Sequence, residues 1–125
     1  MAEFALRGVR KHFGRIEAVR GLDLDGADGE FVVLLGPTGA GKTTTLRLLA
    51  GLERPDAGQI LIAGNEVSTL EPAARDVTFV FQQYSLYPHL SVYDNLAFPL
   101  RSPARRWDEA RIRAKVQEVA ALLRI

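Results

Sequence analysis

Residues 36–43 (Gly-Pro-Thr-Gly-Ala-Gly-Lys-Thr) limit what this chain can fold into more than any other segment. Residues 30–35 (Glu-Phe-Val-Val-Leu-Leu) precede them as a nearly continuous apolar run, which is typical of a strand buried on both faces. Residues 42–50 follow with apolar side chains at helical spacing, and Gly51 stands where a helix C-cap is expected. We therefore predict a strand, a glycine-rich turn and a helix in direct succession.

The turn matches the pattern G-x-x-x-x-G-K-[ST] in the strand-to-helix context that this pattern requires. Its glycines let successive backbone N–H groups converge on one anion, and the helix adds the partial positive charge of its N-terminus. Lys42 reaches the β- and γ-phosphates, Thr43 offers a hydroxyl to Mg²⁺, and Thr44 donates to a nearer phosphate. The candidate nucleotide-binding residues are Gly36, Pro37, Thr38, Gly39, Ala40, Gly41, Lys42, Thr43 and Thr44. The alternative is a structural turn with a solvated Lys42.

Period-2 patterns and turn clusters predict the strands outside this segment. They indicate half-buried antiparallel strands over 4–13 and 17–24, a small hairpin formed by 59–62 and 66–67, and a second buried strand over 77–81.

Helical spacing predicts the remaining elements. On the helix over 42–50, Leu46, Leu49 and Ala50 share one face. A short helix is expected over 94–98 and a longer amphipathic helix over 107–125. The apolar stripe of the longer helix consists of Ile112, Val116, Val119 and Leu123. Its last residues, Arg124 and Ile125, offer it no recognisable cap, so we expect a helix that ends without one.

Composition excludes several classes of protein. Sixteen Lys and Arg against fifteen Asp and Glu give a net charge of +1, which argues against nucleic acid as a partner. The longest aliphatic run, residues 31–35, is far shorter than the roughly 20 residues that cross a bilayer. With no cysteine and only two histidines, a zinc site is not expected. The absence of an Asn-Lys-x-Asp sequence, which would recognise guanine, argues against a GTPase.

Two further segments narrow the class of nucleotide-binding protein. Residues 51–60 read Gly-Leu-Glu-Arg-Pro-Asp-Ala-Gly-Gln-Ile, and residues 80–96 read Val-Phe-Gln-Gln-Tyr-Ser-Leu-Tyr-Pro-His-Leu-Ser-Val-Tyr-Asp-Asn-Leu. With residues 36–43 they resemble, in the same order, the ATP-binding subunits of ABC transporters, particularly importers of sugars and related solutes. The resemblance implies an α/β fold: a P-loop NTPase (RecA-like) core, an N-terminal antiparallel β-subdomain and the start of a helical subdomain.

The resemblance also implies roles for individual residues. Phe13 takes the position of the aromatic side chain that stacks on adenine, with a core-facing phenylalanine as the alternative. Gln82 takes the position of the glutamine that touches Mg²⁺ and the attacking water, so Lys42 and Gln82 are the candidate catalytic residues and Thr43 and Gln82 the candidate Mg²⁺ ligands. The expected permease contacts are Tyr84, Leu86, Tyr87, Pro88 and His89.

ATP and Mg²⁺ are thus the expected cofactors. The expected partners are transmembrane permease subunits, a second nucleotide-binding subunit and, through the permease, a solute-binding protein. The expected location is cytoplasmic, peripheral on the inner face of the cell membrane.

Three parts of the family's hydrolytic machinery have no match in this sequence. They are a Leu-Ser-Gly-Gly-Gln-like signature, an apolar strand that ends in Asp-Glu, and the histidine that follows them. We therefore expect the N-terminal half of a nucleotide-binding domain, with an incomplete ATP-binding core over 1–85 and the beginning of a helical subdomain over 86–125. Such a piece binds ATP without hydrolysing it. The alternatives are a soluble ABC-type ATPase without a membrane partner and a non-catalytic nucleotide-binding module.

Overall fold

The computed structural model describes residues 2–83, 85–102 and 105–125. The chain forms two compact units, residues 1–79 and 80–125, and each is described by itself.

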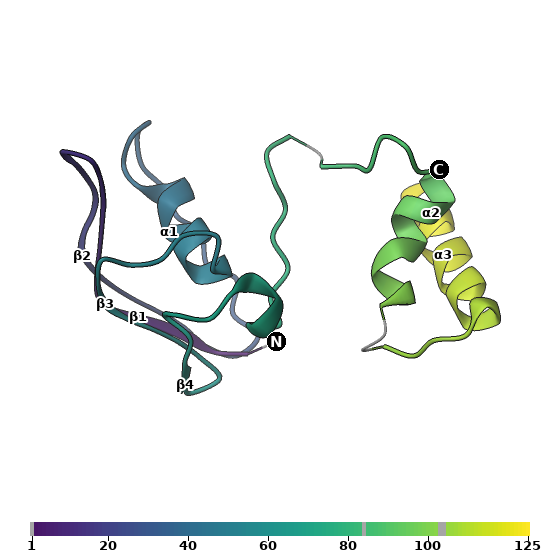
Figure 1. Cartoon of the computed structure of the whole chain (residues 1–125), viewed down its shortest axis with the longest axis horizontal. Helices are drawn as coiled ribbons and strands as arrows, with labels where there is room; N and C mark the ends of the chain where they lie inside the picture. The colour runs from purple at the N-terminus through teal and green to yellow at the C-terminus, as the bar shows by residue number, and fades with distance from the viewer. Residues whose placement is uncertain (1, 84, 103–104) are drawn as a thin grey trace. The chain divides into compact units, whose positions relative to one another are not determined.

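A four-stranded antiparallel sheet is the framework of the first unit (Figure 1). Its spatial order is β2-β1-β3-β4. Every neighbouring pair is antiparallel, so the predicted antiparallel strands and the small hairpin are confirmed. The strands are β1 (Phe4–Phe13), β2 (Ile16–Gly26), β3 (Ala57–Ile62) and β4 (Asn65–Glu66).

Helix α1 (Lys42–Ala50) packs on this sheet within the predicted bounds. Gly41 precedes it and Gly51 ends it, both in the left-handed conformation that glycine adopts without steric cost. The predicted apolar face was partly wrong: Leu46 is 47% exposed, whereas Leu48 is fully buried. Leu48 contacts the sheet in a core made of Leu6, Val9, Val19, Leu48, Ile60 and Val67. A short 3-10 helix, η1 (Pro72–Ala74), follows the sheet.

The two predicted buried strands are not strands in this structure. Residues 30–35 and 77–81 run outside the sheet. Phe31 is 90% exposed and Val80 is 83% exposed, so both predictions were wrong. A buried strand exists only when neighbouring strands accept and donate its backbone hydrogen bonds and other elements cover its faces. Among the described residues, neither segment is part of a sheet.

The second unit is helical. It contains α2 (Val92–Ala97), a 3-10 helix η2 (Phe98–Arg101) and α3 (Glu109–Leu123). Ser91 and Asp108 cap α2 and α3, since each side chain accepts a hydrogen bond from a backbone N–H in the first helical turn. Ala97, Ile112 and Val116 form the buried core of this unit.

The far end of α3 differs from the sequence-based expectation. Arg124 adopts the left-handed conformation, with φ of 56°, and its N–H bonds back to carbonyls of the last turn. The helix therefore ends in a backbone cap, and the expectation of an uncapped end was wrong. The predicted apolar stripe is buried at Ile112 and Val116 but exposed at Leu123. No helix within the described residues is long and apolar enough to span a membrane.

Candidate nucleotide-binding site

The phosphate loop, defined here as residues 36–41, lies directly before α1 (Figure 1). Gly39 and Gly41 have φ of 84° and 82°, a region that side chains with a Cβ rarely adopt. The Ala40 N–H donates to the Pro37 carbonyl at 3.2 Å and closes a turn inside the loop. These conformations turn the loop back on itself, as a phosphate cradle requires.

The start of α1 supplies the electrostatic part of such a cradle. The first N–H of α1 that pairs within the helix belongs to Thr45, which donates to the Gly41 carbonyl at 2.8 Å. The N–H groups of the three preceding residues have no intrahelical acceptor by the geometry of a helix. The first turn contains no acidic side chain, so the partial positive charge of the helix is not compensated there.

Gly41 fixes the loop against the sheet. A Cβ at this position would lie 2.4 Å from the carbonyl oxygen of Ala18 on β2. Ala18 is an extra residue of β2, because Lys11 pairs with Val19 whereas His12 pairs with Glu17. Such a bulge displaces the backbone locally, and here its carbonyl meets the phosphate loop. Glycine is thus required at position 41 for two reasons, the positive φ and the close approach.

Lys42 lies across the loop. Its Nζ donates to the carbonyls of Gly36 and Pro37, at 2.7 Å each. The Lys42 ammonium group therefore lies against the phosphate loop rather than pointing into solvent away from it. Thr43 is exposed in the first turn of α1, and Thr44 is half-buried beside it.

A cavity of about 740 Å³ lies beside these groups. This volume falls in the range of about 300–1,000 Å³ that small-molecule sites occupy. Its walls come from the phosphate loop, the start of α1, residues 17–23 of β2 and Leu34 and Leu35. Three charged residues on this wall, Glu17, Arg20 and Asp23, were not expected from the sequence, since only the fold brings β2 next to the loop.

Phe13 is the last residue of β1. It pairs with Ile16, so Gly14 and Arg15 form the two-residue turn of the β1–β2 hairpin. The Phe13 side chain is 46% exposed, and it is not part of the buried core of this unit. The Lys11 Nζ stands 5.4 Å from the centroid of its ring. The core-facing alternative for Phe13 is therefore wrong.

Arg75 is a further residue that sequence reasoning missed. It is only 4% exposed, and burial lowers the pKa of its guanidinium below the ordinary value. The guanidinium donates to the carbonyls of Leu48 and Leu49, at 2.7 and 3.0 Å, which end α1. It also donates to Ser68 and Leu70 in the segment after β4. Arg75 thus holds the helix that follows the phosphate loop to the rest of the first unit.

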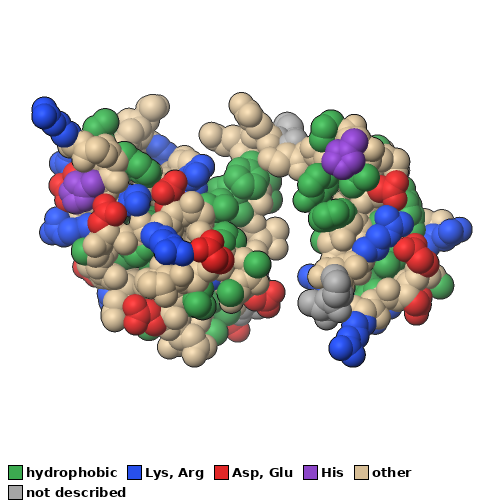
Figure 2. Space-filling view, viewed as in Figure 1, with side chains coloured by type: hydrophobic (Ala, Val, Ile, Leu, Met, Phe, Trp, Pro, Cys, Tyr) green, Lys and Arg blue, Asp and Glu red, His purple; other side chains and the backbone are tan. Residues whose placement is uncertain are grey.

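The predicted glutamine and permease-contact residues belong to the second unit. Gln82 is exposed and lies outside any helix or strand. Leu86, Tyr87, Pro88 and His89 are exposed as well, and the Tyr87 ring packs at 4.6 Å between centroids on Phe98. Tyr84 lies outside the described residues. Figure 2 shows hydrophobic side chains on the viewed surface, among charges of both signs.

Asn95 shapes the segment that carries these exposed side chains. Its Oδ1 accepts from the Tyr87 N–H at 2.8 Å, and its Nδ2 donates to the carbonyls of Tyr87, Leu90 and Ser91 at 3.0–3.2 Å. One amide on α2 therefore satisfies four backbone groups of residues 87–91. The sequence contains no pattern from which this role could be read.

Charged side chains at the start of α2 and α3 are tied together by Arg101. It donates to Asp94 at 2.8 Å and to Glu109 at 3.0 Å. A hydrogen bond from Ser91 and the contact with Arg101 hold the pKa of Asp94 below its usual range. Among the residues described, no group of three or more His, Asp or Glu side chains is arranged to hold a metal ion.

Comparison with known proteins decides the family. The model of the family described as "ABC transporter" matches residues 19–125. This chain belongs to that family.

The chain resembles curated import subunits over its whole length. It is 52% identical over 126 residues to the sn-glycerol-3-phosphate import ATP-binding protein UgpC of Rhodopseudomonas palustris (strain BisB5). It is 45% identical over 125 residues to the UgpC protein of Ralstonia nicotianae. Both alignments cover 100% of this chain and 34% of the relative. The chain thus spans about a third of the length of the curated relatives it matches.

A solved structure has the same fold. The dimeric ATP-binding cassette MJ0796, in a post-hydrolysis state bound to ADP and Pi, matches with a TM-score of 0.78 and 29% sequence identity. The match covers 92% of this chain and 54% of that chain. The expected fold class, a P-loop NTPase core with an N-terminal antiparallel β-subdomain, is therefore confirmed.

Proposed function

We propose that this ABC-family chain binds Mg-ATP at the phosphate loop and the first turn of α1, as the nucleotide-binding part of a transport ATPase. The observation that supports this most is the composition of one cavity wall. It combines a glycine-lined loop in positive-φ conformations, the uncompensated N-terminus of α1 and the Lys42 ammonium. These are the donors that a triphosphate needs, and they converge from a single short segment.

Within this site we assign the phosphates to the backbone N–H groups of residues 36–44 and to Lys42. Lys42 exchanges its bonds to the Gly36 and Pro37 carbonyls for charge-assisted bonds to the β- and γ-phosphates. We assign the adenine base to Phe13, whose half-exposed ring stands at the end of β1. Stacking on one aromatic ring gives affinity for any base and little choice between bases.

Thr43 fits the requirements of a magnesium ligand. Its hydroxyl is a hard oxygen donor, exposed in the first turn of α1 next to the proposed phosphate position. Mg²⁺ is usually held by one or two protein oxygens together with substrate phosphates and waters. Thr43 would hold the ion, which would neutralise charge on the β- and γ-phosphates. Gln82 belongs to the second unit and stays a predicted Mg²⁺ ligand.

We further propose that the complete protein couples ATP hydrolysis to solute import. The names of the relatives support import, and the dimeric cassette of known structure supports a second nucleotide-binding subunit as partner. The exposed side chains at 86–89 favour a permease partner over a purely soluble ATPase, because exposed apolar groups in a loop mark contact surfaces. Such a subunit lies on the cytoplasmic face of the membrane, and a solute-binding protein acts through the permease. The proposed boundary between core and helical subdomain stays at residue 85.

The proposed function is tested by ATP binding and turnover on the chain and two lysine variants. Lys42→Ala should weaken Mg-ATP by about 10- to 150-fold, since hydrogen bonds to charged groups contribute about 1.5–3 kcal/mol. Lys115→Ala is the matched control, because it removes one lysine that pairs with Glu118 on α3. Neither the chain nor the variants should hydrolyse ATP. Equal ATP affinity of Lys42→Ala and the unmodified chain would refute the phosphate-loop assignment.

A further inference from the structure

The end of β1 extends beyond the strand that pairs with it on one side. The last pair between β1 and β3 is Arg10 with Ala57, whereas β1 continues to Phe13. On its other side β1 stays paired with β2 to the hairpin turn. Residues 11–13 therefore lie at a sheet edge where β3 supplies no partner.

Asp56, the residue before β3, takes the place of the missing strand. Its N–H donates to the Arg10 carbonyl at 2.9 Å, which continues the ladder by one bond. Its carboxylate Oδ2 then accepts from the His12 N–H at 2.6 Å. One residue thus satisfies backbone groups of two residues on the exposed edge of β1.

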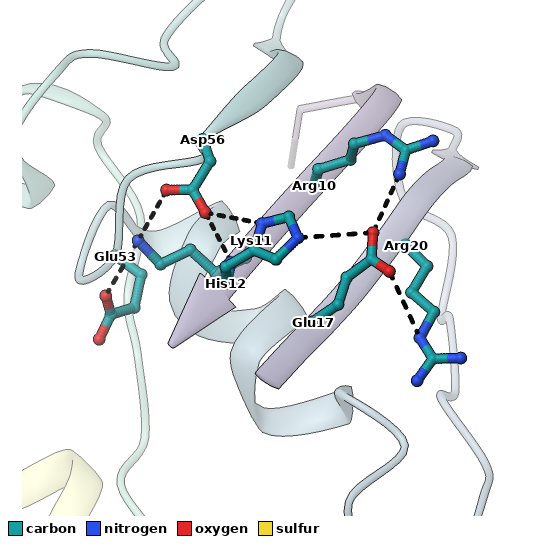
Figure 3. A network of polar contacts seen from close by, with 7 residues as sticks. All are labelled: Arg10, Lys11, His12, Glu17, Arg20, Glu53 and Asp56. Carbon is teal, nitrogen blue, oxygen red and sulfur yellow. Dashed lines mark hydrogen bonds and ion pairs between the residues drawn. The ribbon is translucent and has the colours of Figure 1, made fainter. Parts of the chain in front are cut away.

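The same carboxylate also holds side chains around the hairpin (Figure 3). Its Oδ1 lies 3.4 Å from the Lys11 Nζ and its Oδ2 lies 3.3 Å from the His12 Nδ1. Lys11 stands in turn over the Phe13 ring and also faces Glu53 at 3.9 Å. The backbone hydrogen bond from His12 keeps the pKa of Asp56 below its usual range, so the carboxylate is charged near neutral pH.

We infer that Asp56 is a positioning residue for the nucleobase: by bonding to Arg10, Lys11 and His12 it fixes the end of β1 and so the place of the Phe13 ring. Neither Asp56 nor Phe13 lines the cavity beside the phosphate loop. In this assignment the base extends past the cavity to the Phe13 ring, and Asp56, whose carboxylate is already bonded to Lys11 and His12, acts on the nucleotide through that ring. This inference rests on the proposed function, which places the base on Phe13. Removal of Asp56 should therefore weaken binding of the base and leave binding of the phosphates unchanged.

The test compares Mg-ATP with Mg-tripolyphosphate, which carries the phosphates without a base. Affinities are measured by calorimetry on the full chain and on Asp56→Ala. The loss of one stacked base corresponds to a factor of about 5 to 150 in affinity, and a displaced ring loses part of it. We expect Asp56→Ala to bind ATP about 3- to 30-fold more weakly and tripolyphosphate within about 2-fold of the unmodified chain. Equal losses for the two ligands would show a general structural role and overturn the inference.

A matched control and a double-mutant cycle sharpen the test. Asp25→Ala removes a carboxylate that pairs with Arg7 at the other end of the same two strands, and it should change neither affinity. The double variant Phe13→Ala/Asp56→Ala should bind ATP no more weakly than Phe13→Ala alone, because Asp56 acts through Phe13. Additive losses would overturn the inference.

Failure of the proposed function would give a different set of ligand affinities. If Lys42→Ala leaves tripolyphosphate binding intact, the phosphate-loop assignment fails. If Phe13→Ala leaves ATP affinity intact, the base assignment fails, and the inference about Asp56 falls with it.

Discussion

Gly41→Ala tests the contact between the phosphate loop and β2. Placing a residue with a Cβ in the left-handed region costs about 1–2 kcal/mol of conformational free energy relative to glycine. The added Cβ would also lie 2.4 Å from the Ala18 carbonyl oxygen, well inside the 3.4 Å at which ordinary contacts begin. Relief of such an overlap by backbone shifts costs typically about 1–3 kcal/mol. We therefore expect Gly41→Ala to lower the free energy of unfolding by about 2–5 kcal/mol.

Gly39→Ala is the matched control within the same loop. Gly39 has nearly the same φ, 84°, but no atom lies within 4 Å of an added Cβ. Gly39→Ala should therefore lower the free energy of unfolding only by the cost of the left-handed conformation, about 1–2 kcal/mol. Urea unfolding followed by far-UV circular dichroism, without nucleotide, gives both values. If the two variants are destabilised equally, the close approach to Ala18 contributes nothing and the reasoning fails.

Two further predictions concern the first unit. Arg75→Met should lower the free energy of unfolding by about 3 kcal/mol or more, because it leaves four carbonyls without their donor, at about 1–3 kcal/mol for each buried group. Urea unfolding measures this loss, with the exposed-site variant Arg113→Met as the control. Equal losses of stability in the two variants would contradict the prediction. The folded-state pKa of Asp56 is lowered from an ordinary 3.8, so its contribution to stability is complete above about pH 5 and is lost as the pH falls through the lowered value. The stability difference between the chain and Asp56→Asn, measured by thermal unfolding across this range, should shrink on acidification, and a difference that grows would refute the assignment.

Local signals in the sequence predicted the elements that need no distant partner. Helix α1 has the predicted bounds because Gly41 and Gly51 fix its two ends within the segment itself. The β1–β2 hairpin was predictable for a similar reason, since its strands are adjacent in sequence and joined by a two-residue turn. The phosphate loop likewise lies within eight consecutive residues whose types fix its conformation.

Elements that depend on distant partners were not predictable. Residues 30–35 have the composition of a strand, but composition does not supply the neighbouring strands that make one. The roles of Asp56 and Arg75 arise from bonds to carbonyls and N–H groups far away in sequence. Leu48 rather than Leu46 faces the core because the helix direction is set by packing on the sheet. In the sequence, Asp56 stood out only as a member of residues 51–60, one of the segments that carry the family resemblance.

The apolar run at residues 31–35 couples two equilibria, association of the chain and occupancy of the cavity. Within the described part of the chain no backbone hydrogen bond joins these residues to another segment, and they carry no charge. Backbone groups that pair with no strand bond readily to any extended segment, including that of another copy, so association should grow with protein concentration. Leu34 and Leu35 also form part of the cavity wall. Pairing at this run and occupancy of the cavity therefore act on the same residues, and by reciprocity each shifts the equilibrium of the other.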